Sequence, residues 1–236
     1  FAVDVADNGI DAEHLGDTEP YDAVVLDLGL PQTSSVIGDR SFGSDTAQVI
    51  ALAGVVAQTY IECGILPVIK HIPGHGRGTV DSHKELPVVD ADQATLAASD
   101  FIPFKQLNHI PWGMTAHIVY EALDVDYPAT QSSRVVKDII RGDIGFDGLL
   151  LTDDLNMQAL KGSLADRAAR AICAGVDIIL HCSGKLAEMK EVAAECPHLS
   201  VEAIRRIEAA DTLVSYPVSN DVTGLKNELA DLVELS

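Results

Sequence analysis

The sequence has few basic residues. Lysine and arginine total 16 against 36 aspartate and glutamate residues, which gives a formal net charge of -20 at pH 7. A surface with this excess of negative charge repels phosphate groups, so nucleic acids and anionic membranes are unfavourable partners. We therefore expect no nucleic-acid partner and no membrane partner, and we interpret the acidity as a contribution to solubility.

Cysteine, aromatic residues and long apolar segments are scarce as well. Cys63, Cys173, Cys182 and Cys196 form no Cys-x-x-Cys pair, so buried free thiols in a reducing compartment are a better prediction than disulfides. No basic-then-apolar leader opens the sequence, and no apolar run is long enough to cross a bilayer. These features predict a cytoplasmic protein. A composition that is 47% hydrophobic but only 5% aromatic is typical of a globular chain with an aliphatic core.

What the sequence does contain is a regular alternation of apolar runs and helical patterns. Apolar runs begin near residues 2, 22, 65, 113, 147 and 176, and helical patterns occupy 45–62, 91–107, 133–141, 164–174, 185–195 and 201–215. Strands that alternate with helices form parallel sheets, and functional side chains at strand ends are typical of a TIM barrel. We therefore predict an α/β, TIM-barrel-like (β/α) fold with about six parallel strands. A closed barrel of this type needs eight strands, so the predicted barrel is incomplete.

The segment 70–87, KHIPGHGRGTVDSHKELP, follows the apolar run 65–69. Its glycines and prolines favour a loop that carries polar groups at the end of a buried strand. Within it Asp81 lies two residues before His83, so the carboxylate can orient the imidazole and favour its protonated form. Such a pair can give and accept a proton near neutral pH, as a general acid/base must.

A second segment, 146–157 with the sequence FDGLLLTDDLNM, is an apolar strand that ends in the two carboxylates Asp153 and Asp154. An ionised carboxylate at a strand end can attack the anomeric carbon of a sugar if it faces an acid/base group. For Asp154 we expect either orientation of its neighbours or capping of the following helix.

The run KHIPGHGRGTVDSH resembles the signature of bacterial β-N-acetylglucosaminidases of glycoside hydrolase family 3, and FDGLLLTDDLNM fits the same family. The resemblance implies a retaining glycoside hydrolase that removes terminal β-linked N-acetylglucosamine, with recycled fragments of cell-wall peptidoglycan (muropeptides) as the expected substrate. It implies that Asp153 is the nucleophile and that His83, held by Asp81, is the general acid/base. Lys70 and His71 would bind the sugar. No metal or organic cofactor is implied.

Two further residues are candidates for sugar binding. The stretch IGDRSFG, residues 37–43, is also a motif of this family, and the resemblance implies that Arg40 contacts the sugar. His117 has two interpretations: a histidine at the edge of the core held by a backbone partner, or a pocket residue beside the sugar. The resemblance favours the pocket. Ile72 departs from the family pattern, because an aromatic residue is common at this position.

The beginning of the chain departs further from that family. The DQEGGR-type segment of its early barrel, which supplies another sugar-binding aspartate, is absent from the sequence. Residues 1–31 instead resemble a fragment of a response-regulator receiver domain, with Asp27 in the place of the phosphate-accepting aspartate. The other residues that a receiver needs are missing, so a signalling role is not expected. We predict a receiver-like β-α-β fragment packed into the sheet (1–31), a catalytic portion (32–216) and an amphipathic tail (217–236).

Two other interpretations remain open. The chain is an inactive or sugar-binding remnant if the missing part of the barrel leaves the pocket incomplete, and exposed strand edges then offer a route to oligomers. A hydrolytic metal site is the other, because His71, His75, Asp81 and His83 are ligand types. A Pro-Gly pair separates the first two of these histidines and breaks the helix that an i, i+4 pair of ligands requires, so no metal is predicted.

Overall fold

The computed structural model describes residues 23–27, 42–43, 45–78 and 85–214. Most of the receiver-like fragment 1–31, the predicted strand near residue 2 and the predicted tail 217–236 lie outside these ranges. None of the helices within them combines the length and the apolar character that a membrane span requires.

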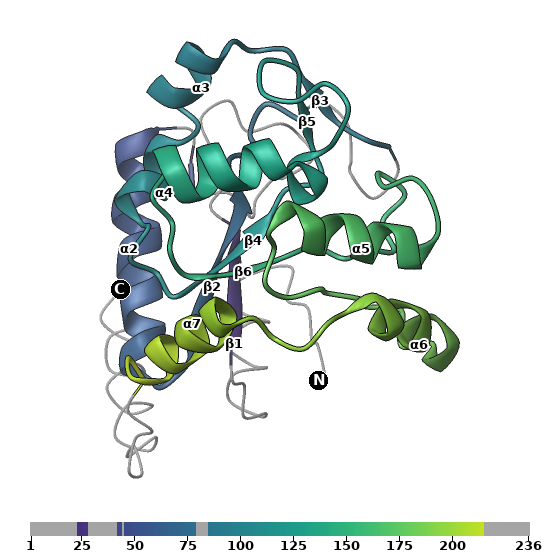
Figure 1. Ribbon diagram of the computed structural model, residues 1–236. Coiled ribbons are helices and arrows are strands. Elements are labelled where there is room, and N and C mark those ends of the chain that lie inside the picture. Colours follow the sequence, from purple (N-terminus) through teal and green to yellow (C-terminus); the bar gives the residue numbers. More distant parts are fainter. Residues whose placement is uncertain (1–22, 28–41, 44, 79–84, 215–236) are drawn as a thin grey trace, which may run out of the picture.

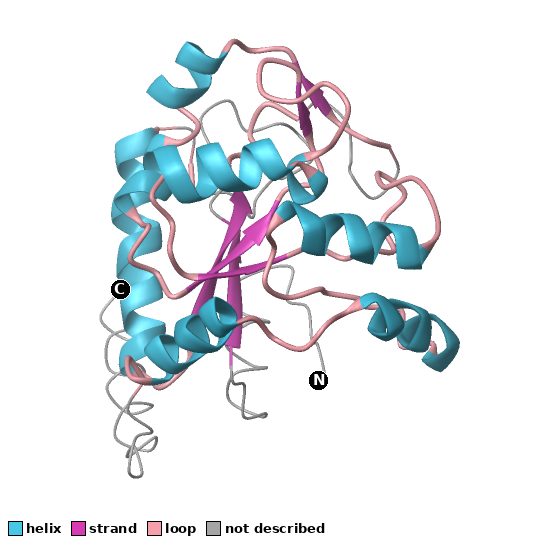
Figure 2. Cartoon of the chain, viewed as in Figure 1, coloured by secondary structure: helices cyan, strands magenta, loops and turns pink. Residues whose placement is uncertain are grey.

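A parallel sheet lies at the centre of the molecule (Figures 1 and 2). Its strands, in spatial order, are β1 (Ala23–Asp27), β2 (Leu66–Ile72), β4 (Trp112–Thr115) and β6 (Leu149–Leu151). Every neighbouring pair is parallel. Each strand of this sheet lies beside the next one along the chain, which is the order of a (β/α) barrel rather than of a doubly wound sheet. The strands predicted near 22, 65, 113 and 147 are confirmed.

The predicted count of six strands is not confirmed. The segment near residue 176 joins the sheet only through one parallel bridge between Leu151 and Ile178. A second sheet pairs β3 (Val88–Val89) with β5 (Val119–Tyr120) in parallel, and the sequence does not predict it. Strands of two residues are too short to produce a periodic pattern.

Helices connect the strands and cover the sheet (Figure 1). They are α2 (Thr46–Glu62), α3 (Gln93–Ala98), α4 (Ile102–Gln106), the 3-10 helix η2 (Ala129–Gln131), the π-helix η3 (Val135–Asp143), α5 (Leu164–Ala174), α6 (Leu186–Glu195) and α7 (Val201–Asp211). The predicted helix 91–107 is two helices, and Pro103 lies in the first turn of the second, where proline is tolerated. The predicted end before Gly142 is wrong, because η3 continues to Asp143.

Helix α5 has the predicted bounds because both of its ends carry strong signals. Ser163 and Asp166 form a reciprocal capping box at its N-terminus, which satisfies two free backbone donors. At its C-terminus Gly175 adopts a φ of +103°, a conformation that glycine reaches without strain. Local residues therefore fix the ends of this helix, which is the next helix along the chain after Asp153 and Asp154.

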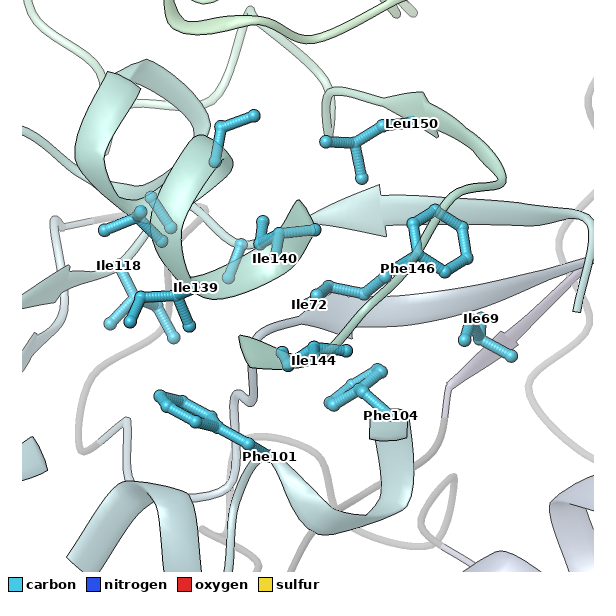
Figure 3. Packing of buried hydrophobic residues seen from close by; sticks show 14 of the residues in the cluster. Ile69, Ile72, Phe101, Phe104, Ile118, Ile139, Ile140, Ile144, Phe146 and Leu150 are labelled. Carbon is cyan, nitrogen blue, oxygen red and sulfur yellow. The ribbon is translucent and has the colours of Figure 1, made fainter. Parts of the chain in front are cut away.

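The main core lies where the sheet meets α2, α4 and η3 (Figure 3). Ile69 and Ile72 of β2 pack there with Phe104, Phe146 and residues of η3, and all four of the named side chains are fully buried. Gly113 of β4 lies against this layer: a Cβ atom at this position would be 2.5 Å from Ile72 Cδ1 and 2.8 Å from Phe146 Cζ. Only glycine allows this approach of β4 to its neighbours.

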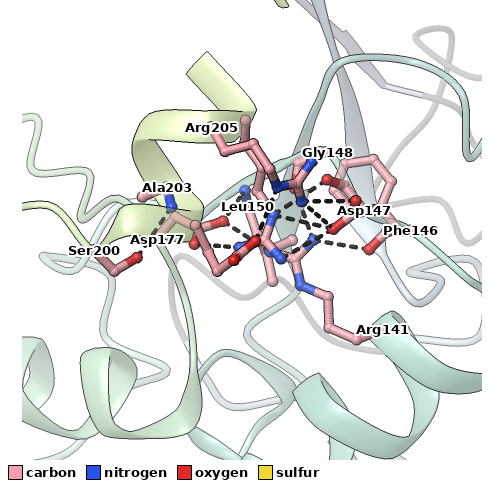
Figure 4. Close-up of polar contacts among 11 residues, drawn as sticks. Arg141, Phe146, Asp147, Gly148, Leu150, Asp177, Ser200, Ala203 and Arg205 are labelled. Carbon is pink, nitrogen blue, oxygen red and sulfur yellow. Dashed lines mark hydrogen bonds and ion pairs between the residues drawn. The ribbon is translucent and has the colours of Figure 1, made fainter. Parts of the chain in front are cut away.

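A network of charged side chains holds α7 against the beginning of β6 (Figure 4). The buried carboxylate of Asp177 accepts hydrogen bonds from Arg141 Nη2 at 2.8 Å, from Arg206 Nη1 at 2.9 Å and from the Leu150 amide at 2.9 Å. Arg205 and Arg206 also contact Asp147, at 2.7 and 3.1 Å. Buried charges are tolerated only when they are paired. These ion pairs therefore stabilise the side of the sheet opposite the carboxyl ends of its strands.

The cysteines are free thiols, as predicted, but their predicted burial is wrong. Cys63, Cys173 and Cys182 are exposed, and Cys196 is half-buried. Neighbouring apolar residues made these positions resemble core positions in the sequence, but Cys63 and Cys196 lie at helix ends, Cys173 lies on an exposed part of α5, and Cys182 lies outside the helices.

Candidate active site

The carboxyl end of β6 presents Asp153 at the edge of the sheet. The buried strand Leu149–Leu151 is followed by Thr152, whose amide donates to Ile178 O at 3.0 Å and whose hydroxyl accepts from the Leu180 amide at 2.8 Å. These bonds hold the backbone just before Asp153. The side chain of Asp153 retains 17% exposure, so it lies at the boundary between the core and solvent, where a substrate could reach it.

His71, at the end of β2, is the charge partner of Asp153. Its Nε2 atom lies 3.4 Å from Asp153 Oδ2, and its side chain is 11% exposed. Burial works to raise the pKa of the Asp153 carboxyl, but the hydrogen bond and the positive charge of His71 outweigh it and hold this pKa well below its usual range. Asp153 is therefore ionised at neutral pH, as a carboxylate nucleophile must be.

Asp154 fixes the turn after the strand. Its amide donates to Asp153 Oδ1 at 2.8 Å, and its own Oδ1 accepts from the amides of Asn156 at 3.1 Å and Cys182 at 3.0 Å. The prediction that Asp154 orients its neighbours is confirmed. The alternative, a helix cap, is wrong, because the next helix begins at Leu164 with Ser163 as its cap.

His117 is buried, with 1% exposure, and both of its ring nitrogens already have protein partners. Nδ1 lies 2.7 Å from Thr130 Oγ1, and Nε2 lies 3.1 Å from the backbone oxygen of Asp154. The pocket interpretation is thus corrected: no ring nitrogen is left for a sugar hydroxyl, and the structure agrees with a histidine held by a backbone partner.

Lys70 precedes His71 in β2, with a half-buried side chain. After this strand the backbone is held at two points: the Tyr120 hydroxyl donates to Gly74 O, and Arg77 Nε donates to the buried Asp100 at 2.8 Å. The segment that carries Asp81 and His83 begins immediately beyond.

Three predicted site residues, Arg40, Asp81 and His83, lie outside the described residues, so their predicted roles stay predictions. Within the described ranges no group of three or more histidine, cysteine, aspartate or glutamate side chains is arranged to hold a metal ion. Asp81 and His83 of the metal hypothesis are outside those ranges.

Sequence reasoning missed several residues that support the site. Thr115 and Thr130 are fully buried and bond to each other at 2.8 Å beside His117. Arg167 of α5 donates to the backbone oxygens of Leu155 at 2.6 Å and Met157 at 3.2 Å. Buried hydroxyls have no periodic signal in a sequence, and an arginine on a helix is usually a surface residue.

The sequence was compared with models of known families. Residues 11–214 match the glycosyl hydrolase family 3 N terminal domain. The match begins before residue 31, so two thirds of the segment that resembles a receiver domain lies within this family's domain, and the resemblance to a receiver stays a prediction.

Curated relatives with similar sequences are β-hexosaminidases. The protein of Tolumonas auensis is 41% identical over 170 residues, which cover 69% of this chain and 49% of the relative. That of Nitrosospira multiformis is 38% identical over 192 residues, 78% of this chain and 54% of the relative. The chain thus spans about half the length of the curated relatives it matches.

Solved structures agree with the fold. A glycoside hydrolase family 3 β-N-acetylglucosaminidase from a Paenibacillus species superposes with a TM-score of 0.71 at 27% identity, over 83% of this chain and 41% of that one. NagZ from Neisseria gonorrhoeae in complex with N-trifluoroacetyl-D-glucosamine gives 0.70 at 30% identity, over 80% and 56%. These neighbours give the described sheet the architecture of a TIM-barrel-like α/β domain. The chain belongs to glycosyl hydrolase family 3, as a member of the family's N-terminal domain.

Proposed function

We propose that the chain catalyses the retaining hydrolysis of terminal β-linked N-acetylglucosamine. The observation that carries the proposal is an ionised carboxylate, Asp153, at a strand end and 3.4 Å from His71, in a chain that belongs to a family of glycoside hydrolases. The names of the curated relatives and the N-acetylglucosamine analogue in the Neisseria structure support the choice of sugar.

The reaction has two displacements at the anomeric carbon. In the first, a carboxylate oxygen of Asp153 forms a bond to this carbon, and the bond to the leaving oxygen breaks as His83 gives that oxygen its proton. In the second, His83 takes a proton from water, the water oxygen attacks the same carbon, and the ester to Asp153 breaks. Two inversions give net retention of configuration. Asp81 holds the His83 ring.

Sugar binding falls to Arg40, Lys70 and His71 in this proposal. All three are donors, and donors satisfy ring hydroxyls that lose water on binding. His117 acts behind the site rather than on the sugar. The proposed reaction needs no metal and no organic cofactor, because the leaving group is activated by proton transfer.

The direct test is hydrolysis of a chromogenic β-N-acetylglucosaminide by the full chain beside Asp153→Asn and His83→Ala. We expect turnover by the parent chain and a loss of at least about a hundredfold in either variant, because each removes one half of the displacement chemistry. Turnover that survives Asp153→Asn would place the nucleophile elsewhere.

We further propose that the natural substrates are saccharide or muropeptide fragments of peptidoglycan, and that the protein acts in the cytoplasm. The barrel in this proposal is incomplete, with about six strands, and the receiver-like segment 1–31 fills one edge of its sheet. Cleavage of a muropeptide with release of free N-acetylglucosamine, followed by mass spectrometry, tests the substrate.

The alternative function is an inactive or sugar-binding remnant. One observation favours it: the sequence lacks the DQEGGR-type segment that, by the family resemblance, supplies another sugar-binding aspartate. A remnant would bind N-acetylglucosamine without turnover, and calorimetry separates this outcome from loss of the pocket. The exposed edges of an incomplete sheet would also pair between chains, so we propose oligomers, which size-exclusion chromatography with light scattering detects.

A further inference from the structure

A line of buried hydrogen bonds runs from β4 to the turn that carries the proposed nucleophile. Thr115 Oγ1 lies 2.8 Å from Thr130 Oγ1, which lies 2.7 Å from His117 Nδ1. His117 Nε2 then lies 3.1 Å from the backbone oxygen of Asp154. The side chains of these two threonines and of the histidine are at most 1% exposed, so water does not replace any partner.

The direction of these bonds follows from the last one. A backbone oxygen can only accept, so His117 must carry a proton on Nε2. Burial, the largest influence, lowers the pKa of His117, although the nearby Asp153 charge raises it, and a neutral ring then leaves Nδ1 as an acceptor. Thr130 Oγ1 also lies 3.0 Å from the backbone oxygen of Ala116, but that oxygen already accepts from the Thr130 amide at 3.2 Å, and a hydroxyl has only one proton to donate. The nearer acceptor is His117 Nδ1, at 2.7 Å, so Thr130 donates to Nδ1, and its oxygen can accept from Thr115. The hydroxyl of Thr130 thereby selects one tautomer of His117.

Asp154 transmits this arrangement to Asp153. Its backbone oxygen is held by His117, its carboxylate by the amides of Asn156 and Cys182, and its own amide donates to Asp153 Oδ1 at 2.8 Å. Any shift of the Asp154 backbone therefore moves the donor that fixes one oxygen of Asp153. The other oxygen faces His71 across 3.4 Å.

We propose that Thr130 and His117 are positioning residues for the Asp153 carboxylate, acting through the backbone of Asp154, with Thr130 setting the histidine tautomer that makes this possible. The inference rests on the proposed function for its effect on hydrolysis. Its structural part, the tautomer and its influence on Asp153, holds whether or not the chain turns over substrate.

The test uses Thr130→Val, which keeps the side-chain shape but removes the hydroxyl, and Thr130→Ser, which keeps the hydroxyl. Ser132→Ala is the matched control, since the buried Ser132 hydroxyl bonds to Asp124 and the Val135 amide rather than to His117. Nuclear magnetic resonance of the labelled full chain reports the His117 tautomer from its ring nitrogens and the environment of Asp153 from its carboxyl carbon. Steady-state hydrolysis of a chromogenic β-N-acetylglucosaminide gives kcat and KM.

We expect the parent to show the Nε2–H tautomer of His117 at neutral pH. Thr130→Val should give a mixture of the two His117 tautomers and shift the Asp153 carboxyl signal. It should also lower kcat between about tenfold and a hundredfold while KM changes less than about twofold, because a small misplacement of a reacting group acts on the chemical step. Thr130→Ser should restore the parent values, and Ser132→Ala should keep both signals.

Three results would overturn the inference. The first is an Nδ1–H or doubly protonated His117 in the parent. The second is a Thr130→Val chain whose His117 tautomer and Asp153 carboxyl signal are those of the parent. The third is a Ser132→Ala chain whose signals change as much as those of Thr130→Val, which would make the effect one of general destabilisation. If the parent chain does not hydrolyse the substrate, the proposed function fails for this chain, and the resonance signals alone still decide the inference.

Discussion

Replacement of Gly113 by alanine tests how closely the central strands must pack to form the site. Gly113 lies in β4, between β2, which carries His71, and β6, which leads to Asp153. The added methyl carbon would meet Ile72 Cδ1 at 2.5 Å and Phe146 Cζ at 2.8 Å. Because carbon atoms pack best about 3.5 to 4.0 Å apart, one partner must move by about 1 Å.

The free energy of unfolding should fall accordingly. Overpacking of a core costs about 1 to 3 kcal/mol. Ile72 and Phe146 are both fully buried, so neither side chain can turn toward solvent to make room. We therefore expect a loss of stability in the upper part of that range, about 2 to 3 kcal/mol. The change should also widen the contact between His71 and Asp153, since β4 separates the two strands.

Urea unfolding followed by circular dichroism measures the effect. With a slope of about 2 kcal/mol per molar urea, the midpoint should fall by about 1 to 1.5 M at unchanged slope. Gly54→Ala is the matched control: Gly54 lies inside α2, its added carbon would be 3.5 Å from Leu107 Cδ2, and the helix should gain about 0.5 to 1 kcal/mol. A Gly113→Ala chain as stable as the parent would refute the reasoning.

Three other predictions concern charge. Asp177→Asn should lower the free energy of unfolding by about 3 kcal/mol, because it removes the negative partner of two arginines at a buried site. The control Asp143→Asn removes an exposed charge and should lower the free energy of unfolding by less than about 1 kcal/mol. Thermal melts of both variants measure the difference, and equal losses of stability would contradict the role given to burial. His71→Ala should raise the pKa of Asp153, since burial remains while the hydrogen bond and the electrostatic interaction with His71 are lost. In the parent, ionised Asp153 stabilises the folded chain fully above the unfolded pKa of about 3.9, and this stabilisation is lost as pH falls through the lowered folded value. In the variant the folded pKa of Asp153 is higher, so the acid limb of the pH profile of kcat/KM should move to higher pH. An unmoved limb would exclude His71 as the partner. Burial and then the charges of Asp154 and Asp153 raise the pKa of Cys182 from 9.0 to about 11, so at pH 8 its thiolate is about a hundredfold scarcer than that of an ordinary thiol. In peptide mapping Cys182 should therefore react with iodoacetamide far more slowly than Cys173, although both residues are exposed, and equal rates would show that the surroundings of Cys182 leave the reactivity of its thiol unchanged.

The sequence predicts those parts of the fold whose signals are local. The strands near residues 22, 65, 113 and 147 are apolar runs of sufficient length, and α5 has a capping box and a terminal glycine. The end of η3 was not predictable, because Gly142 usually terminates a helix but here continues a wider π-type turn. The paired strands β3 and β5 depend on tertiary contacts alone.

The candidate site divides in the same way. The sequence places His71 and Asp153 at the ends of two parallel strands, and such ends meet at one edge of a sheet, but the direct contact between these two side chains was not predicted. The sequence left two interpretations of His117 open, and the choice between them depends on Thr130, thirteen residues away, and on the backbone oxygen of Asp154. Neither partner is encoded in the residues around the histidine.

The central claim is that Asp153 forms a covalent bond to the sugar, and trapping that bond tests it most directly. A fluorinated N-acetylglucosaminyl donor with a good leaving group forms the ester but slows its hydrolysis, so the intermediate accumulates. Digestion and mass spectrometry should then find one sugar residue on the peptide that contains Asp153, and no label in Asp153→Asn. A label on another residue, or an unlabelled chain that nevertheless turns over the substrate, would contradict the account.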